Sequence, residues 1–256
     1  MLRLALFDLD GTLIGGRDHL NAISLHAGIE TALGLPEADP DDVPHAGFTD
    51  RATLLALAVH HGLTPDEAQD RVGEALTIKD QVLAHLLAED EADTSIRATP
   101  GAINFVRDLV DAGVICGLVT GNTPFAARSK LARAGFAAEW FRLGGFGDVC
   151  ETRVQLVKNA LVQSARWLPD LRVSEVVVIG DTSLDVTSGS LNGTHTLAVM
   201  TGRGSEAELL RAKPSLLVKN LTEPDMLARL MAACRSAGAR IAPRSSSRRL
   251  RASSIG

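Results

Sequence analysis

One stretch near the N-terminus, residues 4–13 with the sequence LALFDLDGTL, decides the fold of this chain. Its apolar residues are bounded by a turn signal and predict a short buried strand, which ends at Asp8 with Asp10 in the following turn. Residues two apart project from one face of an extended chain, so the two carboxylates can meet at one point. Two anions held together repel each other unless a cation or a donor intervenes. The stretch therefore indicates chemistry: one carboxylate as nucleophile, one as proton carrier, and a metal ion between them.

Length and composition indicate an ordinary globular protein. The chain has 256 residues, 45% hydrophobic and 22% charged, which allows one large core or a core with a smaller domain. No apolar run approaches the roughly 20 residues of a membrane helix, and Asp8 and Asp10 interrupt the N-terminus before a signal-peptide core forms. The three cysteines are far apart and show neither zinc spacing nor a disulfide framework. We expect a cytoplasmic protein.

The charge is unevenly distributed. The formal net charge is −5, but residues 240–256 contain five arginines and no acid, so the rest of the chain is still more acidic. An acidic body argues against a nucleic-acid surface. The terminal segment is rich in serine and arginine and poor in core-forming residues, so we expect 240–256 to be a disordered basic tail.

An all-helical insertion is predicted after the first strand. From residue 18 to about 92 the sequence contains no convincing strand, and its apolar residues recur at helical spacing. Proline and glycine punctuate the segment, and Thr64-Pro65 is a typical helix start. We assign 17–93 to a helical domain, and 1–16 together with 94–239 to the core domain.

The rest of the chain alternates between strands and helices. Strands are predicted at 114–119, 176–179, 196–199 and 215–218, and helices at 101–112, 124–134, 153–167, 184–191, 205–212 and 223–236. This alternation is typical of an α/β fold with a doubly wound parallel sheet, covered by helices on both faces. Ligands of such sheets bind beyond the carboxyl ends of the strands.

Two further strand ends carry polar residues. Thr120 ends one strand and is followed by Gly121, Asn122 and a helix start, where hydroxyl and free N–H groups suit a phosphate. The strand at 176–179 is followed by Gly-Asp-Thr-Ser-Leu-Asp, which places Asp181 at the strand tip and Asp185 one helical turn on. Together with Asp8 and Asp10, these acids would form a cluster of up to four carboxylates. All-oxygen ligands of this kind favour Mg²⁺.

These motifs resemble those of the haloacid dehalogenase superfamily in its phosphatase form. The Asp-x-Asp-Gly-Thr run at Asp8 resembles the first motif, residues 118–122 the second, with its phosphate-binding hydroxyl, and Gly-Asp-x-x-x-Asp at 180–185 the fourth. The resemblance implies that Asp8 is the nucleophile and that Asp10 is the general acid and base. It also implies that Asp8, Asp181 and the Asp10 carbonyl bind Mg²⁺, with Asp185 close by.

The third motif of the superfamily needs a cation, and the usual Lys-Pro pair is absent. Arg153 and Lys158 are the candidates upstream of the fourth motif, and we favour Arg153 because a helix is predicted to start there. Lys130 is a more distant candidate, which we interpret as a surface residue of its helix.

The helical insertion lies where the superfamily often places a cap. Residues 45–50, including Thr49 and Asp50, resemble the cap loop of phosphoglycolate-phosphatase-like and β-phosphoglucomutase-like members, although either residue would also cap the next helix. The implied activity is Mg²⁺-dependent hydrolysis of a small phosphate ester such as phosphoglycolate or a sugar phosphate. A phosphomutase and a non-catalytic binding protein are the alternatives, and the oligomeric state stays open between monomer and homodimer.

Overall fold

Strand β1 (Leu4–Phe7), formed by the decisive stretch, lies inside a six-stranded parallel sheet of order β5-β4-β1-β6-β7-β8. The other strands of this sheet are β4 (Ile115–Thr120), β5 (Phe141–Phe146), β6 (Val176–Gly180), β7 (His195–Val199) and β8 (Leu216–Val218). This computed structural model describes residues 1–43, 47–89 and 95–241, with side chains up to residue 235. The α/β class and the parallel sheet are as predicted.

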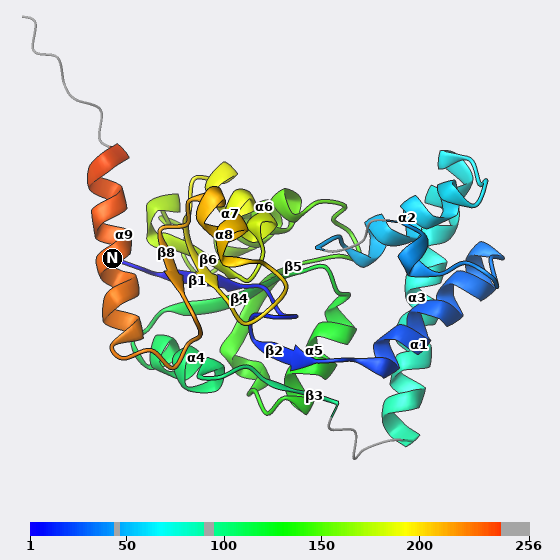
Figure 1. Cartoon of the computed structure of the whole chain (residues 1–256), viewed down its shortest axis with the longest axis horizontal. Helices are drawn as coiled ribbons and strands as arrows, with labels where there is room; N and C mark the ends of the chain where they lie inside the picture. The colour runs from blue at the N-terminus through cyan, green and yellow to red at the C-terminus, as the bar shows by residue number, and fades with distance from the viewer. Residues whose placement is uncertain (44–46, 90–94, 242–256) are drawn as a thin grey trace, which may run out of the picture.

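Both faces of β1 are buried, which is why its sequence is continuously apolar. Leu4 and Leu6 face one hydrophobic cluster together with helix α6 (Arg153–Ser164). Ala5 and Phe7 face the other, which includes side chains of α4 (Ala102–Asp111), α5 (Pro124–Arg133) and α9 (Met226–Ile241). Two further helices, α7 (Ser183–Leu191) and α8 (Glu206–Ala212), pack around Ala198 of β7. The sheet is therefore covered on both sides, as Figure 1 shows.

The strand order reverses at β1. Its neighbours are β4 on one side and β6 on the other, with Phe7 opposite both Leu118 and Ile179. All three strands run in the same direction, so the residues that follow them meet at one edge of the sheet. In open α/β sheets this edge, at the reversal of the order, is where ligands bind.

The inserted helices form a separate unit with its own core. They are α1 (His19–Gly28), which continues as a π-helical turn (Ile29–Leu33), α2 (Asp50–His60) and α3 (Pro65–Glu89). Their buried apolar side chains form one cluster that is distinct from the clusters on the sheet. In Figure 1 this unit lies to the side of the sheet, at the end away from α9. A helical region inserted between β1 and α4 is thus confirmed.

Three strands escape the sequence pattern. Strand β5 has the sequence FRLGGF, in which two glycines interrupt the apolar pattern that would predict a strand. Strands β2 (Ile14–Gly16) and β3 (Ile96–Ala98) have three residues each and pair as an antiparallel ribbon where the chain leaves and re-enters the core. The boundary at residues 93 and 94 lies outside the described residues, so the exact domain limits remain a prediction. Helix α9 continues through residues 240 and 241, which we had assigned to the tail, and residues 242–256 are also outside the described part.

None of the helices in the described ranges is both long and apolar enough to cross a bilayer.

Close packing of α1 against α3 gives a test of the helical unit. A Cβ atom added at Gly28 would lie 2.4 Å from the Ala75 carbonyl oxygen, whereas one added at Gly73, within α3, would meet nothing within 4 Å. We expect Gly28→Ala to lower the free energy of unfolding by about 1–3 kcal/mol. Gly73→Ala should raise it by about 0.5–1 kcal/mol, because alanine favours the helix. Equal effects in urea denaturation would contradict this packing.

Candidate active site

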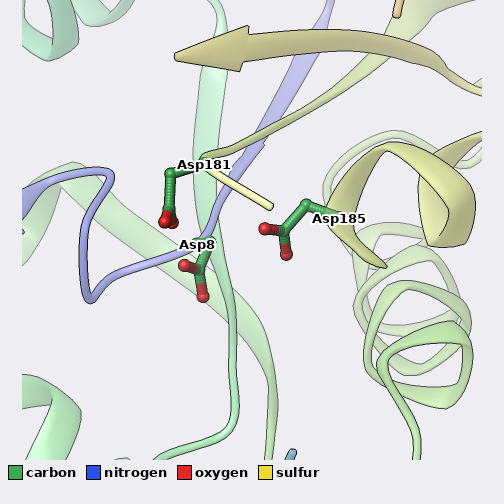
Figure 2. A group of neighbouring side chains, drawn as sticks. All are labelled: Asp8, Asp181 and Asp185. Carbon is green, nitrogen blue, oxygen red and sulfur yellow. The ribbon is translucent and has the colours of Figure 1, made fainter. Parts of the chain in front are cut away.

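Three buried carboxylates converge at the carboxyl edge of the sheet. Asp8 follows β1 and is anchored by a 2.8 Å hydrogen bond from its N–H to the Ile179 carbonyl, Asp181 follows β6, and Asp185 lies in the first turn of α7. Each side chain offers one oxygen, and these oxygens lie within 4.8 Å of one another. Figure 2 shows the three side chains pointing toward a common space. Asp181 and Asp185 lie one helical turn apart after β6, and the pairing of β1 with β6 brings Asp8 to them.

Local contacts fix two of these acids. Asp181 accepts hydrogen bonds from Thr12 Oγ1 (3.1 Å) and from the Arg203 N–H (2.8 Å). Asp185 Oδ2 accepts from Thr182 N (3.0 Å) and Oγ1 (2.6 Å) in the capping box of α7, and Oδ1 faces the cluster. Asp185 therefore takes part both in the capping of α7 and in the acid cluster.

Gly11 lets the turn after β1 approach Asp181. Its φ of +90° is a conformation that L side chains rarely adopt. A Cβ atom there would lie 2.6 Å from Asp181 Oδ2. The glycine in the decisive stretch therefore serves both the turn and the close packing of the acid cluster.

Arg153 is the cation of this cluster. Its Nη1 donates to Asp8 Oδ1 and to Asp185 Oδ1, at 2.6 Å each, and its Nε donates to the Gly47 carbonyl of the inserted unit at 3.0 Å. The residue stands first in α6, whose N-terminus is closed by a capping box at Thr152. Burial lowers the pKa of Arg153, but the charges of Asp185 and Asp8 outweigh burial and raise it, so the guanidinium stays charged.

Lys158, the alternative cation, lies on the same helix but is exposed. Five residues correspond to about 500° of helical rotation, which turns Lys158 well away from the side of α6 that carries Arg153. The geometry therefore favours Arg153 over Lys158 as the cation beside the acids.

The remaining charge of the cluster is anionic. Burial raises the pKa of Asp8 well above its ordinary value, and the Arg153 charge offsets only part of this effect. Burial and the neighbouring charge of Asp185 also raise the pKa of Asp181. Within the described residues, Asp8 Oδ2 is buried without a hydrogen-bond partner. An unsatisfied buried carboxylate oxygen among raised pKa values is what a missing cation would leave.

Asp10 lies outside this group of three. Its carboxylate oxygens lie 2.9 and 3.1 Å from Lys130 Nζ, and Oδ2 accepts a 2.6 Å hydrogen bond from Asn122 Nδ2. The expected cluster of four side chains is therefore wrong for Asp10, whose carboxylate has a cation of its own. The role of its backbone carbonyl toward a metal stays a prediction.

Lys130 corrects a second expectation. We interpreted it as a surface residue, but it is only 3% exposed. Lys130 lies three and four residues after Ala127 and Ala126, which places all three on the buried face of α5. This spacing was the sequence signal that could have predicted its burial.

The loop after β4 places several polar groups beside Asp10. Thr120 is buried, and its Oγ1 accepts hydrogen bonds from Asn122 N (3.3 Å) and Nδ2 (2.8 Å), which leaves its O–H free to donate. Thr123 caps α5, whose first residue is Pro124. The N-terminus of a helix and a free hydroxyl suit an anion.

The inserted unit docks on this loop. The Asp50 N–H donates to the Gly121 carbonyl at 2.8 Å, and Thr123 Oγ1 donates to Asp80 Oδ1 at 2.6 Å. Thr49 is fully buried and caps α2, and the Asp50 carboxylate pairs with the buried Lys79 at 3.0 Å. Thr49 and Asp50 are thus engaged in capping and docking. Their contact with a substrate stays a prediction, and His45 and Ala46 of the same loop lie outside the described residues.

Comparison with solved structures places the same fold in several bacterial proteins. A hydrolase from Pseudomonas syringae is 19% identical, with a TM-score of 0.60, over 91% of this chain and 99% of that one. A predicted phosphoglycolate phosphatase from Haemophilus somnus is 18% identical (TM-score 0.59; 90% and 98% covered). A β-phosphoglucomutase from Clostridium difficile is 15% identical (TM-score 0.65; 94% and 100% covered). At these identities the likeness shows the fold alone.

No curated protein matches this chain. A family description does: the haloacid dehalogenase-like hydrolases match residues 2–193, a range that contains the first strand, the inserted helices and all three carboxylates of the cluster. The motifs of the decisive stretch and the geometry they produce therefore have one common explanation, and the chain belongs to the haloacid dehalogenase-like hydrolase family.

Proposed function

We propose that this protein is a Mg²⁺-dependent phosphatase that hydrolyses a small phosphate monoester through an aspartyl-phosphate at Asp8. One observation carries the proposal: the buried Asp8 carboxylate lies beside two further acids and Arg153. A nucleophile, a cationic partner and an acidic cluster at the carboxyl edge of the sheet together suit the transfer of a phosphoryl group.

A divalent cation fits the three acids. Their donor set is all oxygen, their oxygens lie within 4.8 Å of one another, and Asp8 Oδ2 has no hydrogen-bond partner among the described residues. Asp8 and Asp181 would hold the ion, with Asp185 close by and the Asp10 carbonyl as a further ligand that the family resemblance implies. When bound, the ion would neutralise the pooled negative charge of the acids and the phosphoryl group.

The first step forms a bond between an Asp8 oxygen and phosphorus while the bond from phosphorus to the leaving oxygen breaks. Asp10 gives its proton to that oxygen, so the alcohol leaves neutral. Arg153 offsets the charge on the phosphoryl oxygens, and the Thr120 hydroxyl, with the N–H groups of Gly121 and Asn122, holds them.

The second step releases the phosphate. Asp10, now a carboxylate, takes a proton from a water molecule whose oxygen attacks phosphorus, and the bond to Asp8 breaks. Inorganic phosphate leaves, and Asp8 and Asp10 return to their starting states.

The inserted unit is the proposed cap that excludes water and reads the leaving group. Its loop with Thr49 and Asp50 docks on Gly121 at the proposed phosphate pocket. One solved relative of this fold is described as a predicted phosphoglycolate phosphatase. Phosphoglycolate-like esters and sugar phosphates are therefore the first substrates to test.

The assay is release of inorganic phosphate from a panel of phosphometabolites, with Mg²⁺ and with a chelator. We expect turnover that requires Mg²⁺, and a loss of about 10³-fold or more in kcat for Asp8→Asn, because the amide is not a nucleophile. Turnover by Asp8→Asn at the wild-type rate would refute the assignment. Accumulation of a sugar bisphosphate in place of free phosphate would indicate a mutase, and no turnover on any ester would indicate a binding protein.

Arg153 and Lys158 are distinguished by matched substitutions on one helix. Arg153→Met should lower kcat by about 10²–10³-fold, because the phosphoryl charge loses its partner, and Arg153→Lys should retain part of the rate. Lys158→Met should change kcat less than about twofold, since an exposed side chain contributes little. A larger loss for Lys158→Met than for Arg153→Met would reverse the assignment.

A further inference from the structure

Lys130 is a buried cation that the two steps above leave without a role. It lies on α5 and is 3% exposed, and its Nζ lies 2.9 and 3.1 Å from the two Asp10 oxygens and 2.7 Å from Asn122 Oδ1. An ammonium group is costly to take out of water unless good partners compensate. The contacts with Asp10 and Asn122 are therefore what stabilises Lys130 in its buried position.

The contacts of Lys130 form a closed triangle around one carboxylate. Lys130 donates to both Asp10 and Asn122, and Asn122 donates to Asp10 Oδ2 at 2.6 Å and to Thr120 Oγ1 at 2.8 Å. Both side-chain torsions of Asp10 are therefore fixed from one side. The same side chain is 52% exposed, so its other side is open to a ligand.

A role in the packing of α5 does not account for this arrangement. The nearest other acid, Asp18, is 3.8 Å from Lys130 and has a closer partner in Arg133, at 3.3 Å, one turn further along the same helix. Asp18 is therefore paired without Lys130. Asp10 is the acid to which both Lys130 and Asn122 donate hydrogen bonds.

We propose that Lys130, with Asn122, is a positioning residue that fixes the Asp10 carboxyl group toward the leaving oxygen. This inference rests on the proposed function, in which Asp10 gives the leaving oxygen its proton. A carboxyl group free to rotate presents that proton in the right direction only part of the time, and misplacement by about 1 Å can cost 10²-fold in rate.

The proposal predicts a dependence on the leaving group. A basic alkoxide needs the proton of Asp10 as the bond to phosphorus breaks, whereas p-nitrophenolate is stable enough to leave without it. Loss of Lys130 should therefore slow esters of poor leaving groups and spare esters of good ones. A side chain with only a packing role would affect both classes alike.

The experiment compares benzyl phosphate and p-nitrophenyl phosphate, which have similar shapes and different leaving groups. Lys130→Met should lower kcat/KM by about 10-fold or more on benzyl phosphate and less than about threefold on p-nitrophenyl phosphate. In an Asp10→Asn background, Lys130→Met should cause no further loss on benzyl phosphate, because the two residues act as one unit.

Arg133→Met is the matched control, since it removes from the same helix a partly buried cation that pairs with Asp18. It should leave the ratio of the two substrates unchanged. Thermal unfolding checks that each variant folds. If Lys130→Met does not fold, Lys130→Gln, which keeps a neutral donor, should show the same selective loss.

Equal losses on both substrates, or losses of Lys130→Met and Asp10→Asn that simply add, would overturn the role of Lys130 while the phosphatase assignment stands. A wild-type protein that releases phosphate from neither ester, nor from the metabolite panel, would overturn the proposed function itself and this inference with it.

Discussion

The candidate active site depends on like charges held together at the end of a buried strand. Asp8, Asp181 and Asp185 lie within 4.8 Å of one another, and Arg153 compensates only part of their charge. The pKa values of Asp8 and Asp181 are raised, so these two groups hold more protons in the folded protein than in the unfolded chain from the ordinary values upward. Their own contribution to stability therefore falls as the pH rises through that range. Without a metal the cluster costs stability, and perturbed carboxyl groups of this kind are typical of functional sites.

The two acids of the first motif pair with two different cations. Arg153 faces Asp8, and Lys130 faces Asp10, although only Leu9 separates the two acids in sequence. A buried strand end orients Asp8 into the sheet edge, and the turn that begins at Gly11 leaves Asp10 half-exposed. The same short stretch thus places one desolvated carboxylate beside one that is open to a ligand, and the proposed two-step phosphoryl transfer assigns the nucleophile to the first and the proton carrier to the second.

Much of this was predictable from the sequence because strong local signals marked it. The apolar runs beside Asp8 and Asp181 predicted two strands of a parallel sheet. Because each acid follows its strand, the sequence also predicted that both lie at the same edge of the sheet. Strand β5 was missed because two glycines interrupt its apolar pattern. The prediction that Lys130 lies at the surface was wrong: its spacing from Ala126 and Ala127 indicated the buried face of α5, but its partner Asp10 lies 120 residues away in the sequence. Long-range pairing of charges is what a single sequence conceals.

The most direct test is a crystal structure of the wild-type protein grown with Mn²⁺ as a substitute for Mg²⁺, with the ion located by its anomalous scattering. The account predicts one strong peak at the three acids, with oxygens of Asp8 and Asp181 as ligands and Arg153 still paired with Asp185. Density for the ion elsewhere, or Asp8 and Asp181 turned away from each other at saturating metal, would contradict it.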